Sequence, residues 1–272
     1  MSRLLKTLLL GLSLSVCLGS AHSFNLGKEL KIVKESTQAA GLGGFSDEDE
    51  AAIGRQVAGS LLGASPLVKD KALQKYVNNV GRWVASQSER PDLNWHFGVI
   101  ESKDINAFAA PGGYIFVTRG LYQLLNDEAE LAGVLAHEIG HVIRKHHLKI
   151  LQQSRLVDLG GKLLAKQTGD NDKLKGLIGN GAEMVSRSLD KGAEFEADRV
   201  GVVLATRAGY DAFGLPQVLQ DIGHAGNESS VALLFKTHPH PDERLTKLGD
   251  AMEGRFDDIK GQGLKSRFYK LK

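Results

Sequence analysis

The sequence predicts an α+β fold that is mostly helical, with a small sheet of about three strands beside one buried helix. Three observations predict it. Alternating aromatic and β-branched segments occur only between residues 93 and 118, helix signals dominate the chain after them, and the helix around His137 is apolar enough to be buried. The 272 residues suffice for one or two domains, and no seam divides them.

Local signals place each element along the chain. Ser46, followed by acidic residues, caps a first helix that reaches Leu62, and Pro66 starts a second helix that runs to about Ser86. Asn126 caps the helix that contains His137. Strands are expected at 93–100, 106–109 and 114–118, and further helices at 191–208 and from Pro216 and Pro241. The Gly-rich residues 155–185 between them are a candidate lid.

The first 23 residues are typical of an export signal. Arg3 and Lys6 precede the apolar segment 8–16, and small residues then offer cleavage after Ala21 or Ser23. We therefore expect a signal peptide at 1–23, a linker or arm at 24–45, one domain at 46–272 and a location in the bacterial periplasm. An N-terminal core helix is the alternative to the signal.

Lipid anchoring at Cys17, the only cysteine, is the less favoured alternative for this segment. Leu14-Ser15-Val16-Cys17 resembles a lipobox, but Val16 stands where a small residue is expected. Cleavage near Ser23 would leave a mature chain without cysteine, so no disulfide would stabilise it.

Charge argues against nucleic acid as a partner, and hydropathy argues against a membrane-spanning segment. Lys plus Arg number 34 and Asp plus Glu 32, and the two excess positive charges, Arg3 and Lys6, lie in the first ten residues. The rest of the chain lacks the basic field with which proteins attract nucleic acid, so we expect no such partner. No apolar run approaches the ~20 residues that span a bilayer, so no transmembrane helix is expected in the mature chain.

The segment His137-Glu138-Ile139-Gly140-His141 carries the chemistry. On a helix, a spacing of four places the two imidazoles on one face, about 40° apart, where they can share one Zn²⁺. Glu138, about 100° round the helix, can reach a water molecule at that metal. The surrounding apolar residues supply a helix that is buried, so a chance match is disfavoured.

Zinc needs a third protein ligand, and His147 is one candidate. It lies where the metzincin pattern H-E-x-x-H-x-x-G-x-x-H places its third histidine, but that pattern needs Gly where this chain has Arg144. We expect the helix to continue and to leave His147 about 280° from His137. A solvated basic helix end is then the favoured interpretation.

Glu194 is the other candidate for the third ligand. On a helix it shares a face with Asp198, so one carboxylate can bind the metal while the other hydrogen-bonds a ligating histidine. A solvated acidic stripe is equally compatible with the spacing. Glu196, about 200° from Glu194, is interpreted as structural.

Several segments together resemble the HtpX/Oma/CAAX-prenyl-protease family of gluzincin metallopeptidases, over about residues 47–250. They are Asn106-Ala107-Phe108-Ala109, Pro111-Gly112-Gly113, Glu130 to His141, Glu194-Phe195-Glu196-Ala197-Asp198, and Thr237-His238-Pro239 with Arg244. The membrane members carry transmembrane helices and some periplasmic relatives append a helical-repeat domain. We expect this chain to be the minimal, stand-alone periplasmic form with a zincin-like domain.

The resemblance implies a role for each matching residue. His137, His141 and Glu194 would bind one Zn²⁺ per chain, Glu138 would be the general base, and Asp198 would support a histidine ligand. His238 would stabilise the oxyanion or act as a fourth ligand that closes the resting site. The edge strand Asn106, Ala107, Phe108, Ala109 would pair with an extended substrate. Tyr210 is a weaker oxyanion candidate, and core packing is its simpler interpretation.

The favoured function is a zinc endopeptidase acting on unfolded or extended polypeptide, in the quality control of misfolded or misassembled envelope proteins. The outer-membrane assembly machinery or a membrane surface is a possible partner. The alternative is a periplasmic chaperone or assembly factor whose zinc site is structural or latched. The intact Glu138 argues against a purely structural site, because such a site has no use for a base.

Overall fold

The computed structural model describes residues 44–153, 190–225 and 228–271. By its contacts, the chain from Gly44 to Lys272 forms one unit. The predicted signal peptide, most of the predicted arm, Cys17 and the candidate lid lie outside the described residues. Within them, no helix is long and apolar enough to cross a membrane.

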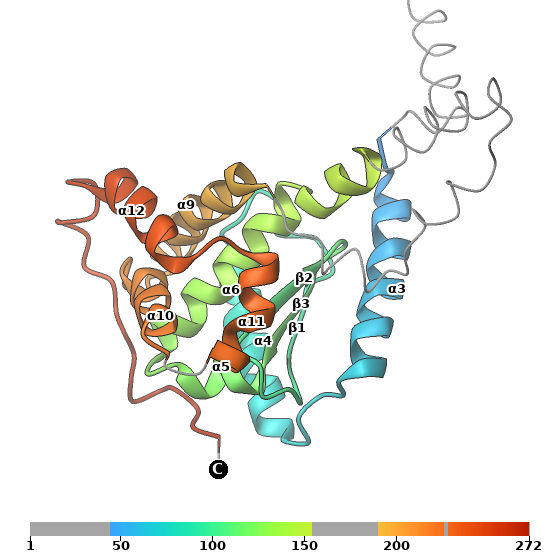
Figure 1. Ribbon diagram of the computed structural model, residues 1–272, viewed down its shortest axis with the longest axis horizontal. Helices are drawn as coiled ribbons and strands as arrows, with labels where there is room; N and C mark the ends of the chain where they lie inside the picture. The colour runs from blue at the N-terminus through green and yellow to red at the C-terminus, as the bar shows by residue number, and fades with distance from the viewer. Residues whose placement is uncertain (1–43, 154–189, 226–227, 272) are drawn as a thin grey trace, which may run out of the picture. The chain divides into compact units, whose positions relative to one another are not determined.

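The predicted α+β, mostly helical class is confirmed (Figure 1). In chain order the elements are α3 (Asp47–Ala64), α4 (Lys71–Ala85), β1 (His96–Ile100), β2 (Ala107–Ala110), β3 (Tyr114–Thr118), α5 (Arg119–Leu124), α6 (Glu128–Ile143), α9 (Lys191–Arg207), α10 (Gly214–Gly223), α11 (Glu228–Thr237) and α12 (Pro241–Met252). The predicted strands are found within a few residues of their expected bounds. Neither α5 nor α11 was predicted.

Two predicted helix starts are wrong because a nearby aspartate is the better cap. The second helix begins at Lys71, not at Pro66, since the Asp70 carboxylate accepts from two amides of the first turn. The helix around His137 is capped by Asp127, which accepts from the Glu130 amide, rather than by Asn126. A third predicted start also differs: helix α10 begins at Gly214, two residues before the expected proline, and no side chain caps it.

The three strands form one mixed sheet in the order β1-β3-β2. Strand β3 pairs in parallel with β1 and antiparallel with β2, so β2 lies at an edge, with Phe108 opposite Phe116. Side chains alternate between the two faces of the sheet. Ile115 and Val117 join the core with α4 and α6, whereas Phe116 packs with Ala58 of α3 on the opposite face.

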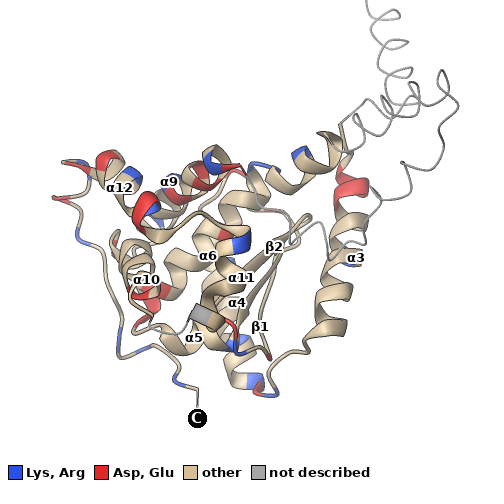
Figure 2. Ribbon diagram, viewed as in Figure 1, with Lys and Arg blue, Asp and Glu red and all other residues tan. Residues whose placement is uncertain are grey.

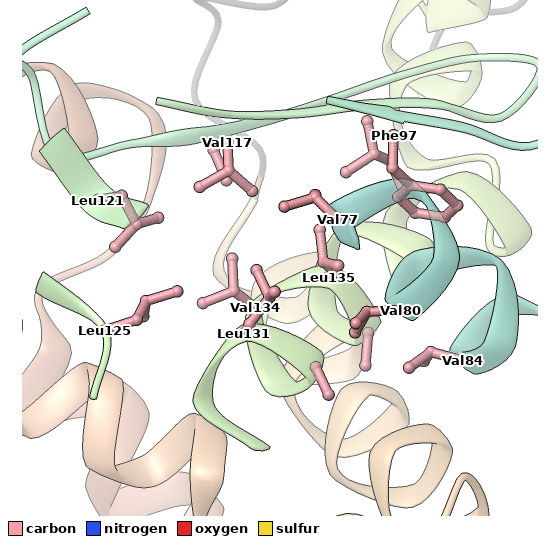
Figure 3. Packing of buried hydrophobic residues seen from close by; sticks show 14 of the residues in the cluster. Val77, Val80, Val84, Phe97, Val117, Leu121, Leu125, Leu131, Val134 and Leu135 are labelled. Carbon is pink, nitrogen blue, oxygen red and sulfur yellow. The ribbon is translucent and has the colours of Figure 1, made fainter. Parts of the chain in front are cut away.

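Helix α6 is the centre of the core. All sixteen of its residues are buried, and it packs against α4, α9, α10 and the sheet. Figure 3 shows Leu131, Val134 and Leu135 of this helix facing valines of α4 and the sheet residues Phe97 and Val117. Because α6 carries His137, Glu138 and His141, the core itself fixes the backbone beneath these side chains.

Two glycines allow α9 to approach α6 closely. A Cβ on Gly201 would lie 3.0 Å from the His137 backbone nitrogen, and a Cβ on Gly140 would lie 3.2 Å from the Ala197 Cα. Real Cβ contacts are rarely this short, so either side chain would push the helices apart. The approach brings the first turn of α9, which carries Glu194, towards the imidazoles of α6.

We expect Gly201→Ala to lower the free energy of unfolding by about 1–3 kcal/mol, because the added methyl overpacks the contact between α6 and α9. Gly249→Ala is the matched control, since Gly249 is exposed in α12 and its Cβ would meet nothing within 4 Å. That control should gain up to about 1 kcal/mol from helix propensity. Urea titrations of both variants measure the difference, and equal stabilisation of the two would contradict the close contact.

Candidate metal centre and active site

His137 and His141 project from adjacent turns of α6 towards one point. Their Nε2 atoms lie 3.0 Å apart, and both side chains are almost fully buried. Burial lowers the pKa of both imidazoles, and neighbouring charged or titratable groups, Arg244 for His137 and His137 for His141, lower them further. Both rings are therefore held neutral, which is the form that binds a metal ion.

Glu194 enters the same point from the first turn of α9, which is capped by Asp190. One carboxylate oxygen lies 3.7 Å from His137 Nε2 and the other 3.5 Å from His141 Nε2. Both oxygens are buried, and neither has a hydrogen-bond partner among the described residues. Burial raises the pKa of Glu194 well above its ordinary value, because nothing adjacent supplies a sufficient countercharge.

His238, directly after α11, completes a cluster of four. Its Nε2 lies 3.8 Å from a Glu194 oxygen, and its backbone amide donates to the Leu234 carbonyl at 2.8 Å. One potential ligand atom from each of His137, His141, Glu194 and His238 lies within 4.8 Å of the others.

These four residues fit a metal ion. Three neutral imidazoles and one carboxylate are the donors that zinc and similar transition metals prefer. The carboxylate is also orphaned, and a buried polar group normally has a partner. A divalent cation at the shared point would satisfy both carboxylate oxygens and supply the missing countercharge.

Asp198 and Arg244 form an ion pair behind His137. The His137 Nδ1 atom lies 2.9 Å from an Asp198 oxygen, and Arg244 donates to Asp198 from Nε at 3.0 Å and from Nη2 at 2.6 Å. Burial acts to raise the pKa of Asp198, but the Arg244 guanidinium and the contact with His137 outweigh it and hold that pKa below its usual range. The ionised Asp198 can thus accept the Nδ1 proton and leave His137 Nε2 free for a metal.

Glu138 lies on α6 next to these ligands, in apolar surroundings. It lines, with His137 and Arg244, a cavity of about 30 Å³ whose other walls are apolar side chains of β2, α5, α6, α10 and α11. Burial raises the pKa of Glu138 to about 8, with Arg244 acting in the opposite direction. A carboxylate that basic is suited to accept a proton near neutral pH.

The edge strand borders the same cavity. Ala107 is one of its lining residues, and Asn106, fully buried, accepts the Ala107 amide proton on its side-chain oxygen at 3.0 Å. The side-chain nitrogen Nδ2 of Asn106 has no partner among the described residues. The Phe108 side chain packs on the α3 face of the sheet, whereas Ala109 joins the main core.

The structure corrects the interpretation of the residues after α6. The helix does not continue through Arg144: it ends at Ile143, Lys145 adopts a left-handed conformation with φ 54°, and helical backbone resumes at His146. His146 and His147 are buried rather than solvated, so the predicted solvated helix end is wrong. The His147 ring lies 5.8 Å from that of His141, yet His147 is not part of the four-residue cluster.

Two other residues prove to be placed away from the cluster. Tyr210 is buried and donates to Glu128 at 2.9 Å, which supports core packing over a role at the oxyanion. Glu196 contacts His146 and Arg144 and is not part of the four-residue cluster.

The comparisons with known proteins decide the family. The profile of peptidase family M48 matches residues 71–252, about two thirds of the chain. The chain belongs to peptidase family M48. The peptidase family that the sequence motifs resemble is thereby confirmed, and the four-residue cluster and Glu138 all fall within the matched segment.

Named relatives of this M48 chain agree. It is 32% identical over 211 residues to the beta-barrel assembly-enhancing protease of Yersinia pestis, covering 74% of this chain and 43% of that protein. The corresponding protein of Escherichia coli (strain K12) is 30% identical over 205 residues, covering 72% and 42%. The mitochondrial metalloendopeptidase OMA1 of Schizosaccharomyces pombe is 30% identical over 174 residues, covering 64% and 51%. The chain thus spans about half, or less, of the length of these relatives.

Sequence reasoning noted Arg244 without giving it a role, and it missed His146. The pairing of Arg244 with Asp198 joins α12 to α9, a contact between residues 46 positions apart that spacing does not encode. The contact of His146 with His141 depends on the break at Lys145. That break was not predicted, because a lysine in the left-handed conformation cannot be recognised from the sequence as a glycine could.

We expect Arg244→Leu to lower the free energy of unfolding by about 3–5 kcal/mol, because it leaves the Asp198 carboxylate buried without its partner. Adding Asp198→Asn should recover part of the loss, since it removes the uncompensated charge. Urea titrations in the presence of chelator measure this without any contribution from metal.

Arg119→Leu is the matched control for that substitution. Arg119 pairs with Glu101 at the surface, where the two side chains are 32% and 43% exposed, so its loss should cost only about 0–1 kcal/mol. Similar losses in the two single variants would contradict the importance of the buried pair.

Proposed function

We propose that this M48 chain is a zinc-dependent endopeptidase, with His137, His141 and Glu194 as its metal ligands. The observation that carries the proposal is the orphaned Glu194 carboxylate facing two neutral imidazoles, with Glu138 beside them on the same helix. Bound zinc would supply Lewis-acid activation of a water molecule and of the scissile carbonyl. The donor set of nitrogen and carboxylate oxygen supports zinc over magnesium or calcium.

Glu138 would carry the proton during hydrolysis. Its carboxylate takes one proton from the attacking water, whose oxygen forms the new bond to the scissile carbonyl carbon. Glu138 then gives that proton to the leaving amine as the carbon–nitrogen bond breaks, so the carboxylate is regenerated. Asp198, held by Arg244, would keep His137 in the tautomer that directs Nε2 to the metal.

Extended polypeptide is the substrate that the edge strand supports. Strand β2 has one neighbour in its sheet, and it leads directly to the cavity beside Glu138. A substrate strand added along Asn106–Ala109 would be read chiefly through its backbone, which favours unfolded chain over a narrow sequence. The side-chain Nδ2 of Asn106, which has no partner among the described residues, would donate to a substrate carbonyl.

The proposed setting is the cell envelope. The export signal predicted at 1–23 supports a periplasmic location, and relatives named beta-barrel assembly-enhancing protease support a role near outer-membrane assembly. Misfolded or misassembled envelope proteins would then be the physiological substrates. Residues of both charge signs lie along α9 and α12 (Figure 2).

We expect Glu138→Gln to retain zinc and to lower the rate of casein digestion about 10²–10⁴-fold, because only the proton carrier is removed. Wild type with chelator should be equally inactive. Glu130→Gln is the matched control, because Glu130 is buried two turns earlier on α6 and accepts from Asn126, outside the cluster. The substitution should leave the rate of digestion unchanged. Near-normal digestion by Glu138→Gln would overturn the assignment of the base.

A latched binding protein is the second candidate function, and the position of His238 favours it. Four protein ligands within 4.8 Å of one another resemble a closed structural site, in which no position is left for water. If His238 latches the site, His238→Ala should gain digestion of casein relative to wild type. If His238 stabilises the oxyanion, the same variant should lose digestion while retaining zinc.

A further inference from the structure

His141 has a hydrogen-bond partner of its own, separate from the ion pair behind His137. Its Nδ1 atom lies 2.9 Å from Nδ1 of His146, and both rings are almost fully buried. On the other side of that ring, His146 Nε2 lies 3.3 Å from one carboxylate oxygen of Glu196, and the other oxygen lies 3.2 Å from Arg144 Nε. The three side chains form a chain of contacts from the cluster outward to a half-exposed carboxylate.

The proton positions in this chain follow from the geometry. Since His141 Nε2 faces His137 and Glu194, a neutral His141 that offers its Nε2 lone pair must carry its proton on Nδ1. That proton can only be donated to His146 if His146 Nδ1 is unprotonated. His146 then carries its own proton on Nε2, where the Glu196 carboxylate accepts it. The opposite tautomer of either histidine would place two hydrogen-bond donors or two acceptors opposite each other.

The break after α6 is what creates this contact. In an unbroken helix, a residue five positions after His141 would point about 140° away from it. Lys145, in the left-handed region with φ 54°, reverses the chain so that the His146 ring returns to His141. A left-handed lysine is strained, and strain of this kind is retained where the surrounding structure requires it. The Lys145 ammonium lies 3.1 Å from the buried Glu50 carboxylate, which helps to hold the turn.

We propose that His146, supported by Glu196, is a positioning residue that fixes His141 in the tautomer and orientation needed to bind the metal. The inference rests on the proposed metal site. It gives the two histidines of the cluster different supports: an aspartate–arginine ion pair for His137 and a neutral imidazole for His141. His146 touches neither substrate nor metal in this assignment, so its effect is on metal affinity.

The test measures zinc affinity by competition with a chromogenic chelator, using the metal alone and the full mature chain. His146→Leu removes the acceptor and should weaken zinc binding about 10–100-fold, the usual effect of losing a partner of a metal ligand. His146→Asn places an amide oxygen near the position of Nδ1, so it should recover most of the affinity. Equal affinity in wild type and both variants would overturn the proposal.

His147→Leu is the matched control. His147 is the adjacent buried histidine, and its ring contacts that of His141, but the structure records no hydrogen bond between these two residues. It should therefore keep zinc affinity close to wild type. A loss as large as in His146→Leu would show that packing around the break, rather than the hydrogen bond, supports His141.

Two further readouts separate positioning from mere folding. In the zinc-loaded protein, the His141 Nδ1 proton should give a slowly exchanging imidazole signal in ¹H–¹⁵N spectra, present in His147→Leu and lost in His146→Leu. Melting of the metal-free variants should show that His146→Asn folds like wild type. If wild type itself binds no zinc, the proposed function fails; if wild type binds zinc and His146→Leu binds it equally well, only this inference fails.

Discussion

The contact between α6 and α9 is the constraint on which the rest of the structure depends. It places a carboxylate, from α9, against two imidazoles, from α6, inside an apolar core. Neither helix could bring these groups together alone, and glycines at positions 140 and 201 are what allow the backbones to approach. A site built this way is rigid, because moving either helix would disturb the packing of the whole core.

Two of the carboxylates buried around this contact, those of Asp198 and Glu128, have specific partners. Asp198 is neutralised by Arg244. Glu128 at the start of α6 accepts from Tyr76 and Tyr210 at 2.9 Å each and forms an ion pair of 2.9 Å with Arg267. The Glu194 carboxylate is different, since its two oxygens are buried without a hydrogen-bond partner among the described residues. Because buried polar groups normally have a partner, these two unsatisfied oxygens fit the binding of a cation.

Local sequence signals were sufficient for most of the fold and for two of the four residues of the cluster, His137 and His141. The buried helix around His137 and the three short strands are encoded by apolar spacing and β-branched alternation, which act over neighbouring residues. Glu194 and His238 came from a family resemblance, because spacing alone could not separate Glu194 from a solvated stripe. The left-handed Lys145 and the Arg244 contact were not predictable, since both are determined by tertiary partners rather than by local propensity.

The buried Glu50 carboxylate connects the turn after the edge strand β2 with the break after α6. One of its oxygens accepts from the Gly112 amide in the turn between β2 and β3, and the other lies 3.1 Å from Lys145 in the break after α6. Arg90 binds both oxygens, and although burial acts to raise the pKa of Glu50, the two cations outweigh it and lower that pKa. The edge strand that borders the cavity and the turn that returns His146 to His141 are therefore held by one ionised side chain. Because α3 supplies that side chain, this helix on the far face of the sheet supports both the edge strand β2 and His141 of the four-residue cluster.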